Sequence, residues 1–338
     1  MTVNHRIVLD TRPTGEASVD NFRMETAEIA ALTSGQVLIR HHYLSLDPYM
    51  RGRMNDTQSY APPQPLGKVM VGATAGEVME SRSDQFVPGQ MVVGRGGWQE
   101  YSVVEGPDLA TLRKVDSARI ALSHHLGALG APGVTAWYGL TVICKPKAGE
   151  TMLVSAATGA VGSAVGALSK ARGCHTVGIA GGPDKCRYAL SELGFDACID
   201  YKAHSSAETL SAALAQACPK GIDGYFENVG GMVLDAILPR MNARGRVAVC
   251  GMISGYEGAA IPLAAPQLIL TSRLTLQGFS IGEHADVWPQ ALAELGTLFV
   301  EGKLRPRETI AEGLAAAPQA MLGLLRGRNL GKQLVKLV

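Results

Sequence analysis

A glycine-rich stretch near the middle of the chain has the residue types and spacing of a phosphate-binding turn. Residues 155–166 read SAATGAVGSAVG, and they follow the apolar run TMLV. Between a buried strand and a helix, small residues let phosphate oxygens approach the main chain and the free N–H groups at the helix start. We therefore expect the pyrophosphate of a dinucleotide at Gly159 and Gly162. A tight turn without a ligand is the alternative, because close packing of a helix on a strand also requires small residues.

The end of the next predicted strand bears on which dinucleotide binds. The turn reads AATGAVG, with alanine at the first glycine position of the usual Gly-x-Gly-x-x-Gly pattern. An NAD site usually places an acid about 20 residues beyond the glycines, where this chain reads IAGGPDKCR. Cations at Lys185 and Arg187, without an acid at the strand tip, favour a 2′-phosphate and hence NADP(H). Asp184 argues for NAD, although it falls in the predicted start of the following helix.

Three tyrosines, Tyr49, Tyr60 and Tyr256, are the candidate catalytic residues. Each lies beside glycines or prolines, which indicates a loop. With a reference pKa near 10, a tyrosine is protonated at neutral pH and can donate to an oxygen that gains negative charge. Tyr256 is the first choice because it follows CGMIS at the predicted carboxyl end of a strand. Packing at a cleft edge is the alternative for each of them, and water or the cofactor ribose hydroxyl could take the same role.

The elements that must position these residues change character along the chain. Up to about residue 125, stretches such as GQVLIRHHYLSL and GQMVVGRGGWQEYSVV show near-alternating apolar residues broken by glycine and proline, which predicts a small β-barrel or sandwich. From residue 150, short apolar strands alternate with helical segments over short connections. This alternation predicts a parallel sheet covered on both faces. The terminal GKQLVKLV is predicted to be a strand that returns to the first domain.

The composition is that of an ordinary globular protein. The chain has 338 residues, 46% of them apolar and 18% charged, with a formal net charge of +1. This length favours two domains, and the scattered Lys and Arg give no footprint for nucleic acid or for a membrane surface. No apolar run of about 18 residues indicates a membrane span, and the opening MTVNHRIVLDTRPTGEAS lacks the apolar core of a signal peptide. We expect a cytoplasmic protein.

Several long stretches together carry a family resemblance. They are VSAATGAVGSAVGALSKARGCHTVGIAGGPDKCRYALSELGFDACIDYK, CPKGIDGYFENVGG, AVCGMISGY, YLSLDPYMRGRM and EGLAAAPQAMLGLLRGRNLGKQLVKLV. This set resembles the zinc-independent medium-chain dehydrogenases/reductases, and within them the leukotriene B4 12-hydroxydehydrogenase, prostaglandin reductase and curcumin reductase group. YFENVGG and LDPYMRGRM are the specific signals, and the resemblance spans nearly the whole chain.

The resemblance implies an α/β protein of two domains. A GroES-like β-barrel domain, residues 1–127 and 303–338, would surround an inserted Rossmann domain with a doubly wound parallel sheet, residues 128–302, and the active site would lie in the cleft between them. The implied activity is NADPH-dependent reduction of the C=C bond of α,β-unsaturated ketones and aldehydes by hydride transfer to the β-carbon. The resemblance also implies a homodimer formed through sheet edges.

The resemblance also assigns residues to the parts of the cofactor. Gly159, Ala160, Val161 and Gly162 would hold the pyrophosphate, and Lys185 would meet the 2′-phosphate with Tyr201 nearby. The nicotinamide half would be lined by a larger set of residues, namely Asn228, Cys250, Gly251, Met252, Ile253, Ser254, Tyr256, Phe279, Ser280, Ile281 and Asn329.

The chain departs from the zinc-dependent members of the superfamily. Those carry a cysteine ligand and a Gly-His-Glu motif where this chain reads LSLDPYM and PLGKVMVG. The six cysteines form no Cys-x-x-Cys pair, so we expect no metal and interpret them as buried apolar residues. Two alternatives to the enone reductase remain, an NADPH quinone oxidoreductase and a non-catalytic NADPH-binding sensor. Arg51 and Arg53 are either solvated or attract a substrate carboxylate.

Overall fold

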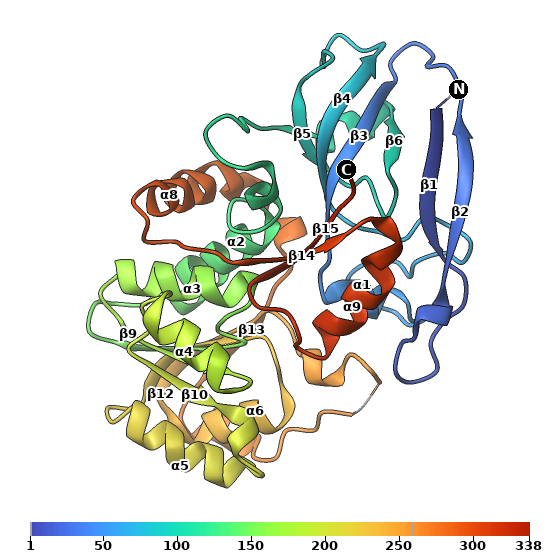
Figure 1. Cartoon of the computed structure of the whole chain (residues 1–338). Helices are drawn as coiled ribbons and strands as arrows, with labels where there is room; N and C mark the ends of the chain where they lie inside the picture. The colour runs from blue at the N-terminus through green and yellow to red at the C-terminus, as the bar shows by residue number, and fades with distance from the viewer. Residues whose placement is uncertain (1, 259) are drawn as a thin grey trace. The chain divides into compact units, whose positions relative to one another are not determined.

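The computed structural model describes residues 2–258 and 260–338, and the chain divides into two compact units (Figure 1). The first is Met1–Gly127 with Glu308–Val338, and the second is Ala128–Arg307. The second division falls at 307/308, whereas the sequence-based boundary is 302/303. The intervening residues are tied to the second unit, since the Tyr188 hydroxyl donates to the Arg305 carbonyl at 3.3 Å and Arg307 pairs with Glu192 at 2.8 Å.

The first unit is built on a sheet of seven strands. Its order is β14-β15-β3-β4-β5-β7, and β6 pairs with β3. The strands are β3 (Val37–Ser45), β4 (Thr74–Ser81), β5 (Met91–Gly94), β6 (Tyr101–Val104), β7 (Arg113–Lys114), β14 (Glu308–Glu312) and β15 (Lys332–Lys336). β15 pairs antiparallel with β3, with Leu334 opposite Ser45. The C-terminal strand therefore lies in the same sheet as strands from the first 127 residues.

A hairpin and two helices pack around the largest of the apolar clusters in the described part of the first unit. The hairpin is β1 (Thr2–Leu9) with β2 (Phe22–Ile29), and the helices are α1 (Tyr49–Arg53) and α9 (Ala317–Leu325). The ring of Phe22 stacks on that of the buried Trp98, with centroids 5.1 Å apart. Met50 of α1 and Met321 of α9 are buried in the same core. Packing therefore fixes α1, which begins at Tyr49.

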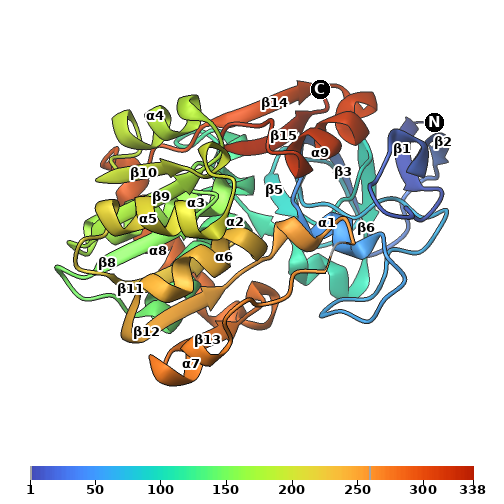
Figure 2. The ribbon, with the colours of Figure 1, turned by 90° about the horizontal axis from the view of Figure 1, so that it is seen from below.

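The second unit contains a six-stranded parallel sheet of order β10-β9-β8-β11-β12-β13. Its strands are β8 (Thr151–Ser155), β9 (His175–Ala180), β10 (Ala197–Asp200), β11 (Ile222–Glu227), β12 (Met241–Val249) and β13 (Thr275–Gly278). Figure 2 shows them from β10 at the top of the view to β13 at the bottom. All five residues of β8 are buried, which explains its continuous apolar run, because a strand covered on both faces has no solvent side.

Helices cover both faces of this sheet, as the alternating sequence pattern predicts. They are α2 (Ala131–Tyr138), α3 (Ala160–Ala171), α4 (Pro183–Ser191), α5 (Ala207–Ala217), α6 (Gly231–Ile237), α7 (Gln267–Thr271) and α8 (Trp288–Val300). α2 packs against α3 and α8, and α5 packs against α6. In Figure 1, α2 and α8 lie above the sheet, and α5 and α6 lie below it.

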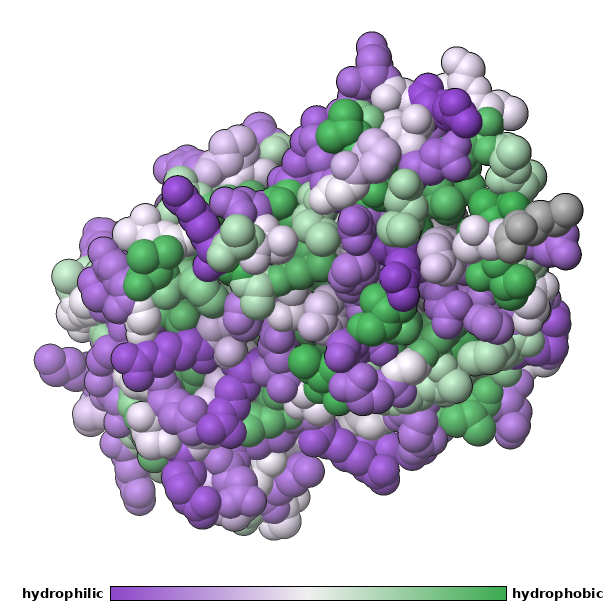
Figure 3. Space-filling model, turned by 45° about the horizontal axis from the view of Figure 1, so that its top comes forward, coloured by the Kyte–Doolittle hydropathy of each residue, from purple (hydrophilic) through white to green (hydrophobic). Residues whose placement is uncertain are grey.

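The surface has no continuous apolar belt on the face that Figure 3 shows, where hydrophilic and hydrophobic residues are interspersed. Among residues 2–258 and 260–338, Leu270 and Val300 are the most exposed large apolar side chains, each 79% exposed. None of the helices found in residues 2–258 and 260–338 has both the length and the apolar content that a membrane crossing requires.

Candidate functional site

The turn between β8 and α3 presents a row of backbone donors. Gly159 is the N-cap of α3, which has no acidic residue in its first turn and no side-chain cap. The N–H groups of Ala160, Val161 and Gly162 donate to no acceptor within the described residues. Free N–H groups at the start of a 12-residue helix carry partial positive charge and attract an anion. The geometry therefore suits a phosphate group at the residues that the sequence singles out.

Packing explains some of the glycines in this turn. A Cβ on Gly162 would lie 2.3 Å from the Ala156 carbonyl oxygen, and one on Gly166 would lie 2.4 Å from the Phe195 ring. A Cβ on Gly159 would meet only the Ala156 oxygen, at 3.2 Å. The tight turn and the phosphate site are therefore compatible, because the close packing brings the start of α3 against the end of β8 and leaves its N–H groups free.

Two lysines, Lys185 and Lys202, lie near each other beyond the ends of β9 and β10. Burial lowers the pKa of Lys185, and the charge of Lys202 lowers it further. A Cβ on Gly181, which follows β9, would lie 2.9 Å from the Tyr201 ring and 3.1 Å from the Lys202 Cε. The side chains of Tyr201 and Lys202 therefore lie against the tip of β9. Lys202 was missed from the sequence, although it directly follows the predicted Tyr201.

The carboxylate of Asp200 holds the backbone after β9 and after β10 in place. Asp200 Oδ1 accepts the N–H groups of Gly182 at 2.7 Å and of Lys202 at 3.0 Å. Asp184, which argues for NAD in the sequence, has an 88% exposed side chain and pairs with Arg187 at 3.0 Å. Arg187 pairs with Asp184 at the surface. Lys185 and Lys202 lie close enough for the charge of Lys202 to lower the pKa of Lys185, and two cations this close together suit a phosphate group.

The residues predicted for the nicotinamide half come together at the carboxyl ends of β11 and β12. The Asn228 carbonyl accepts the N–H of Ile253 at 3.2 Å, and the Val229 carbonyl accepts the N–H of Ser254 at 3.0 Å. A Cβ on Gly251 would lie 3.0 Å from the Tyr256 hydroxyl oxygen and 3.6 Å from the Asn228 carbonyl oxygen. The Tyr256 hydroxyl is therefore folded back over Gly251, beside Asn228.

The rest of the segment between β12 and Tyr256 is a partly exposed loop. Cys250 and Met252 flank Gly251 in it. Burial raises the pKa of the Cys250 thiol to about 12, so the thiol is protonated at neutral pH and is no nucleophile. This agrees with the interpretation of the cysteine as an apolar residue.

Aromatic rings surround Phe279, which follows β13. Its centroid lies 5.3 Å from that of Tyr138 and 6.2 Å, edge-on, from that of Phe226. His284 stacks on Tyr138 at 4.1 Å. Ser280 and Ile281 continue the chain directly from Phe279. The predicted segment 279–281 thus belongs to a four-ring cluster. The sequence pointed only to Phe279, because Tyr138 and Phe226 come from segments far from it in the chain.

The other two candidate tyrosines lie in the first unit. Tyr49 is the first residue of α1, and burial together with the charge of Asp47 raises its pKa well above the usual range. Its hydroxyl is therefore protonated at neutral pH and available as a donor. Tyr60 is 68% exposed. Asp47 accepts a hydrogen bond from the buried Lys332 at 2.7 Å and another from Ser45.

Two predicted residues of the first unit are held by local contacts. The Asn329 side chain donates to the Gly331 carbonyl at 2.7 Å, and Asn329 is the one predicted cofactor residue outside the second unit. Arg51 is 1% exposed and donates to Asn55 Oδ1 and to the Gly15 carbonyl, each at 2.6 Å. The expectation that Arg51 is solvated or attracts a substrate is wrong, because its guanidinium is buried in holding a loop against α1.

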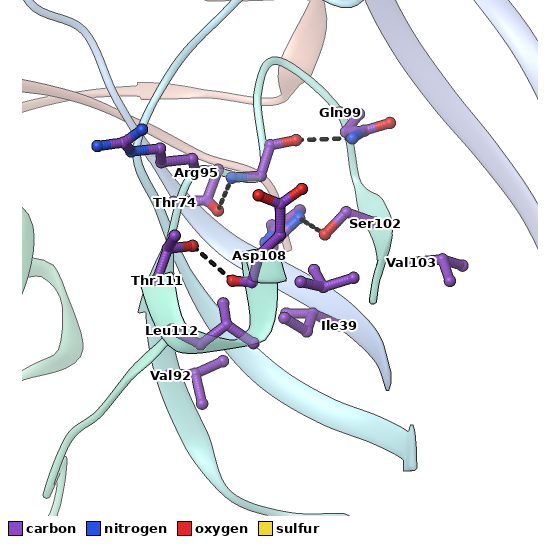
Figure 4. A pocket seen from close by; sticks show the side chains of 14 residues that line it. Ile39, Thr74, Val92, Arg95, Gln99, Ser102, Val103, Asp108, Thr111 and Leu112 are labelled. Carbon is purple, nitrogen blue, oxygen red and sulfur yellow. Dashed lines mark hydrogen bonds between the residues drawn. The ribbon is translucent and has the colours of Figure 1, made fainter. Parts of the chain in front are cut away.

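A cavity of about 290 Å³ lies in the first unit, away from these residues. Its polar wall includes His41, Thr74, Arg95, Ser102 and Asp108 (Figure 4). Burial lowers the pKa of His41 to about 3, so its ring is neutral, and its Nε2 lies 2.9 Å from the Ser102 hydroxyl. The part of the wall that the structure describes includes none of the predicted site residues. The predicted site and this cavity are therefore different places.

Side chains that bind metals are not gathered anywhere in the described ranges. Within residues 2–258 and 260–338, no three His, Cys, Asp or Glu side chains are grouped so as to hold an ion. All six cysteines are free, and four of them are buried.

Comparison with known proteins places the chain in a family. Residues 5–112 match the family described as N-terminal domain of oxidoreductase, and residues 160–297 match the one described as Zinc-binding dehydrogenase. The chain is 46% identical to the NADPH-dependent curcumin reductase of Escherichia coli, over 98% of this chain and 96% of that protein. It is 39% identical to the NADP(+)-dependent 2-alkenal reductase of Nicotiana tabacum, over 98% and 97%.

A solved structure agrees over the same extent. CurA from Vibrio vulnificus in complex with NADPH is 41% identical and superposes with a TM-score of 0.92, covering 99% of each chain. The predicted fold class, a GroES-like domain with a Rossmann-like parallel-sheet domain, is thereby confirmed. The chain belongs to the medium-chain dehydrogenase/reductase family, in the group that contains the curcumin and 2-alkenal reductases.

Proposed function

We propose that the chain is an NADPH-dependent reductase of the C=C bond in α,β-unsaturated ketones and aldehydes. The observation that carries this proposal is the anion site of the second unit, in a chain so similar to a curcumin reductase. Three free N–H groups at the start of α3 suit a pyrophosphate, and the neighbouring charges of Lys185 and Lys202 suit a 2′-phosphate. An NADH enzyme would instead offer an acid at the end of β9.

The remaining cofactor contacts follow from the placement of residues within the second unit. Asn228, the loop from Cys250 to Ser254 and the segment from Phe279 to Ile281 would line the nicotinamide half. The Tyr201 ring, which lies against Gly181, would border the adenosine phosphate. Asn329 belongs to the same proposal, as a residue contributed by the first unit.

The chemistry needs a hydride and a hydrogen-bond donor. Bound NADPH supplies the hydride. Negative charge then develops on the substrate carbonyl oxygen, and a tyrosine hydroxyl aimed at it would contribute about 3 kcal/mol. Alignment of the two reactants would contribute on the order of 7–11 kcal/mol. Tyr256 is the first candidate, because its hydroxyl lies beside Asn228 and Gly251, and Tyr49 and Tyr60 are the others.

Two further proposals concern the state of the protein in the cell. We propose a homodimer that forms through β13, the edge strand of the parallel sheet, because Thr275 and Gln277 are exposed there and Leu270 is 79% exposed nearby. Light scattering on a sizing column tests the dimer. We propose a cytoplasmic location, which the six free thiols support, because oxidising compartments favour disulfides.

The test is NADPH oxidation followed by absorbance with an aliphatic enone such as 3-nonen-2-one, run beside NADH and beside a quinone. We expect rapid oxidation of NADPH, much slower oxidation of NADH, and a saturated ketone as the product. Turnover with the quinone alone would identify a quinone oxidoreductase. Tight NADPH binding without turnover on any acceptor would identify a sensor.

A further inference from the structure

Glu227, the last residue of β11, carries a buried carboxylate that the proposed chemistry does not use. The residue is 0% exposed. Burial raises the pKa of its carboxyl group, and no cation of the described chain is among the groups that oppose this shift. A buried carboxylate without a cation is unfavourable unless hydrogen bonds satisfy it. The hydrogen bonds that Glu227 accepts therefore show what keeps it there.

Three donors converge on one oxygen of the carboxyl group, and the Tyr225 side chain also acts to lower the pKa of that group. Glu227 Oε1 accepts from the N–H of Val229 at 2.5 Å, from the N–H of Gly230 at 3.0 Å and from the Ser155 hydroxyl at 3.0 Å. Val229 and Gly230 form the turn after β11, whereas Ser155 ends β8 immediately before the phosphate-binding turn. One carboxylate oxygen thus joins two turns at the carboxyl edge of the sheet.

Ser155 extends this connection to Asn228. Its hydroxyl oxygen accepts the N–H of Asn228 at 2.9 Å, and its carbonyl accepts the side-chain Nδ2 at 2.8 Å. The Asn228 amide nitrogen therefore points back to β8, which leaves its Oδ1 free of hydrogen bonds within the described chain. The orientation of this side chain depends on Ser155, and Ser155 is held by Glu227.

The same residue also supports the loop after β12. The Glu227 main-chain carbonyl accepts the N–H of Cys250 at 2.9 Å and of Gly251 at 3.2 Å. The side chain fixes the turn whose carbonyls hold Ile253 and Ser254. Glu227 therefore contacts three of the segments assigned to the cofactor, either directly or through Ser155. They are the end of β8 before the glycine turn, Asn228 with the turn after it, and the loop from Cys250.

We propose that Glu227 is a positioning residue for NADPH binding, which sets the Ser155–Asn228 contact and the turn at 229–230 through the three hydrogen bonds that its Oε1 accepts. This inference rests on the proposed function, which assigns Asn228 and the loop from Cys250 to the nicotinamide half. The requirement is an acceptor at Oε1. Neither a negative charge nor a transferable proton at Glu227 is needed.

Asp223, in the same strand, provides a matched control. Its Oδ2 accepts the N–H of Thr151 at 2.9 Å and its Oδ1 accepts the Asn242 side chain at 2.7 Å. Asp223 thus also ties β11 to β8, but near the amino end of the strand, away from the cofactor turns. Removing either carboxylate should lower the stability of the sheet. Only removal of Glu227 should also weaken NADPH binding, because only Glu227 contacts the turns assigned to the cofactor.

The experiment compares Glu227→Leu, Glu227→Gln and Asp223→Leu by NADPH fluorescence titration, by melting temperature, and by kcat and KM with the enone. We expect Glu227→Leu to raise the Kd for NADPH about tenfold or more and Glu227→Gln to restore most of that affinity. Asp223→Leu should lower the melting temperature while it leaves the Kd within about twofold of wild type. If Glu227→Leu does not fold, Ser155→Ala removes the same link and should raise the Kd alone.

Two results would overturn the inference. In one, Glu227→Leu or Ser155→Ala binds NADPH as tightly as Asp223→Leu does. In the other, Glu227→Gln loses binding as completely as Glu227→Leu, which would make the charge the essential feature. The Kd comparison is independent of turnover, so a wild-type protein that binds NADPH without reducing the enone would refute the proposed function and still decide the role of Glu227.

Discussion

Each unit holds a carboxylate in a network of hydrogen bonds, half-buried Asp47 in the first and fully buried Glu227 in the second, and the two are satisfied in different ways. In the first unit, Asp47 pairs with Lys332, a cation that lies 285 positions away along the chain. In the second, Glu227 accepts from N–H groups two and three residues further on and from the Ser155 hydroxyl, with no cation. The hydrogen bonds of Asp47 therefore depend on two segments that are far apart in the chain. Those of Glu227 come largely from the same strand and the turn that follows it.

The largest expected effect breaks the pair in the first unit. Lys332 is 2% exposed, and its ammonium donates to the Leu46 carbonyl as well as to Asp47, each at 2.7 Å. Lys332→Met leaves Asp47 without its cation and should lower the free energy of unfolding by about 3 kcal/mol. Chemical denaturation measures this. Lys303→Met, which removes an exposed ion pair with Glu301, should change it by less than about 1 kcal/mol, and equal losses in both variants would contradict the comparison.

The second prediction concerns the like-charged pair of the second unit. Replacing Lys185 and Lys202 together by alanine should raise the Kd for NADPH about 100-fold, because two charge-assisted hydrogen bonds to a phosphate are lost. The Kd for NADH should stay nearly constant, since NADH lacks that phosphate. Titration with both nucleotides measures the difference. Arg187→Ala is the control, because Arg187 pairs with Asp184 at the surface, and a loss as large as that of the double variant would shift the site to Arg187.

A third prediction tests whether the turn between β8 and α3, whose donors are backbone N–H groups, tolerates a methyl group at Gly162. In Gly162→Ala the new Cβ would lie 2.3 Å from the Ala156 carbonyl oxygen, so the start of α3 must move away from β8. We expect a loss of about 1–3 kcal/mol in the free energy of unfolding and weaker NADPH binding. Gly296→Ala in α8 meets nothing within 4 Å and should stabilise by up to about 1 kcal/mol. Unchanged NADPH affinity in Gly162→Ala would separate this turn from the phosphate site.

The smallest expected effect is a pH dependence from Glu227. Its pKa in the folded protein is raised by burial, so folding favours the protonated carboxyl group. This contribution to stability is present below the unfolded pKa and is lost as the pH rises through the folded pKa. Glu227→Gln cannot ionise, so its melting temperature relative to wild type should be higher at about pH 7 than at about pH 4. A constant difference at both pH values would mean that burial of the charge costs nothing here.

Features that depend only on residues adjacent in the sequence were predictable from it. The glycine turn could be predicted because a strand, a turn and a helix start form from consecutive residues, and steric limits at Gly162 act within one turn. Tyr201 was found through the family resemblance, whereas Lys202, its neighbour, was missed. Lys202 approaches Lys185 only because β10 pairs in parallel with β9, which aligns Asp200 with Ala180. No spacing along the chain reveals that alignment.

The alternation of strands and helices, the glycine-rich turn and the lack of an acid at the strand tip were determined by the sequence itself, since each follows from local sterics and hydrophobic periodicity. Only the tertiary structure decided that Arg51 is a buried structural residue, that the rings of Tyr138 and Phe226 meet Phe279, and that Lys332 meets Asp47. Those contacts join segments far apart in the chain. Their partners are chosen by packing and by the need to satisfy buried charge, which no local pattern encodes.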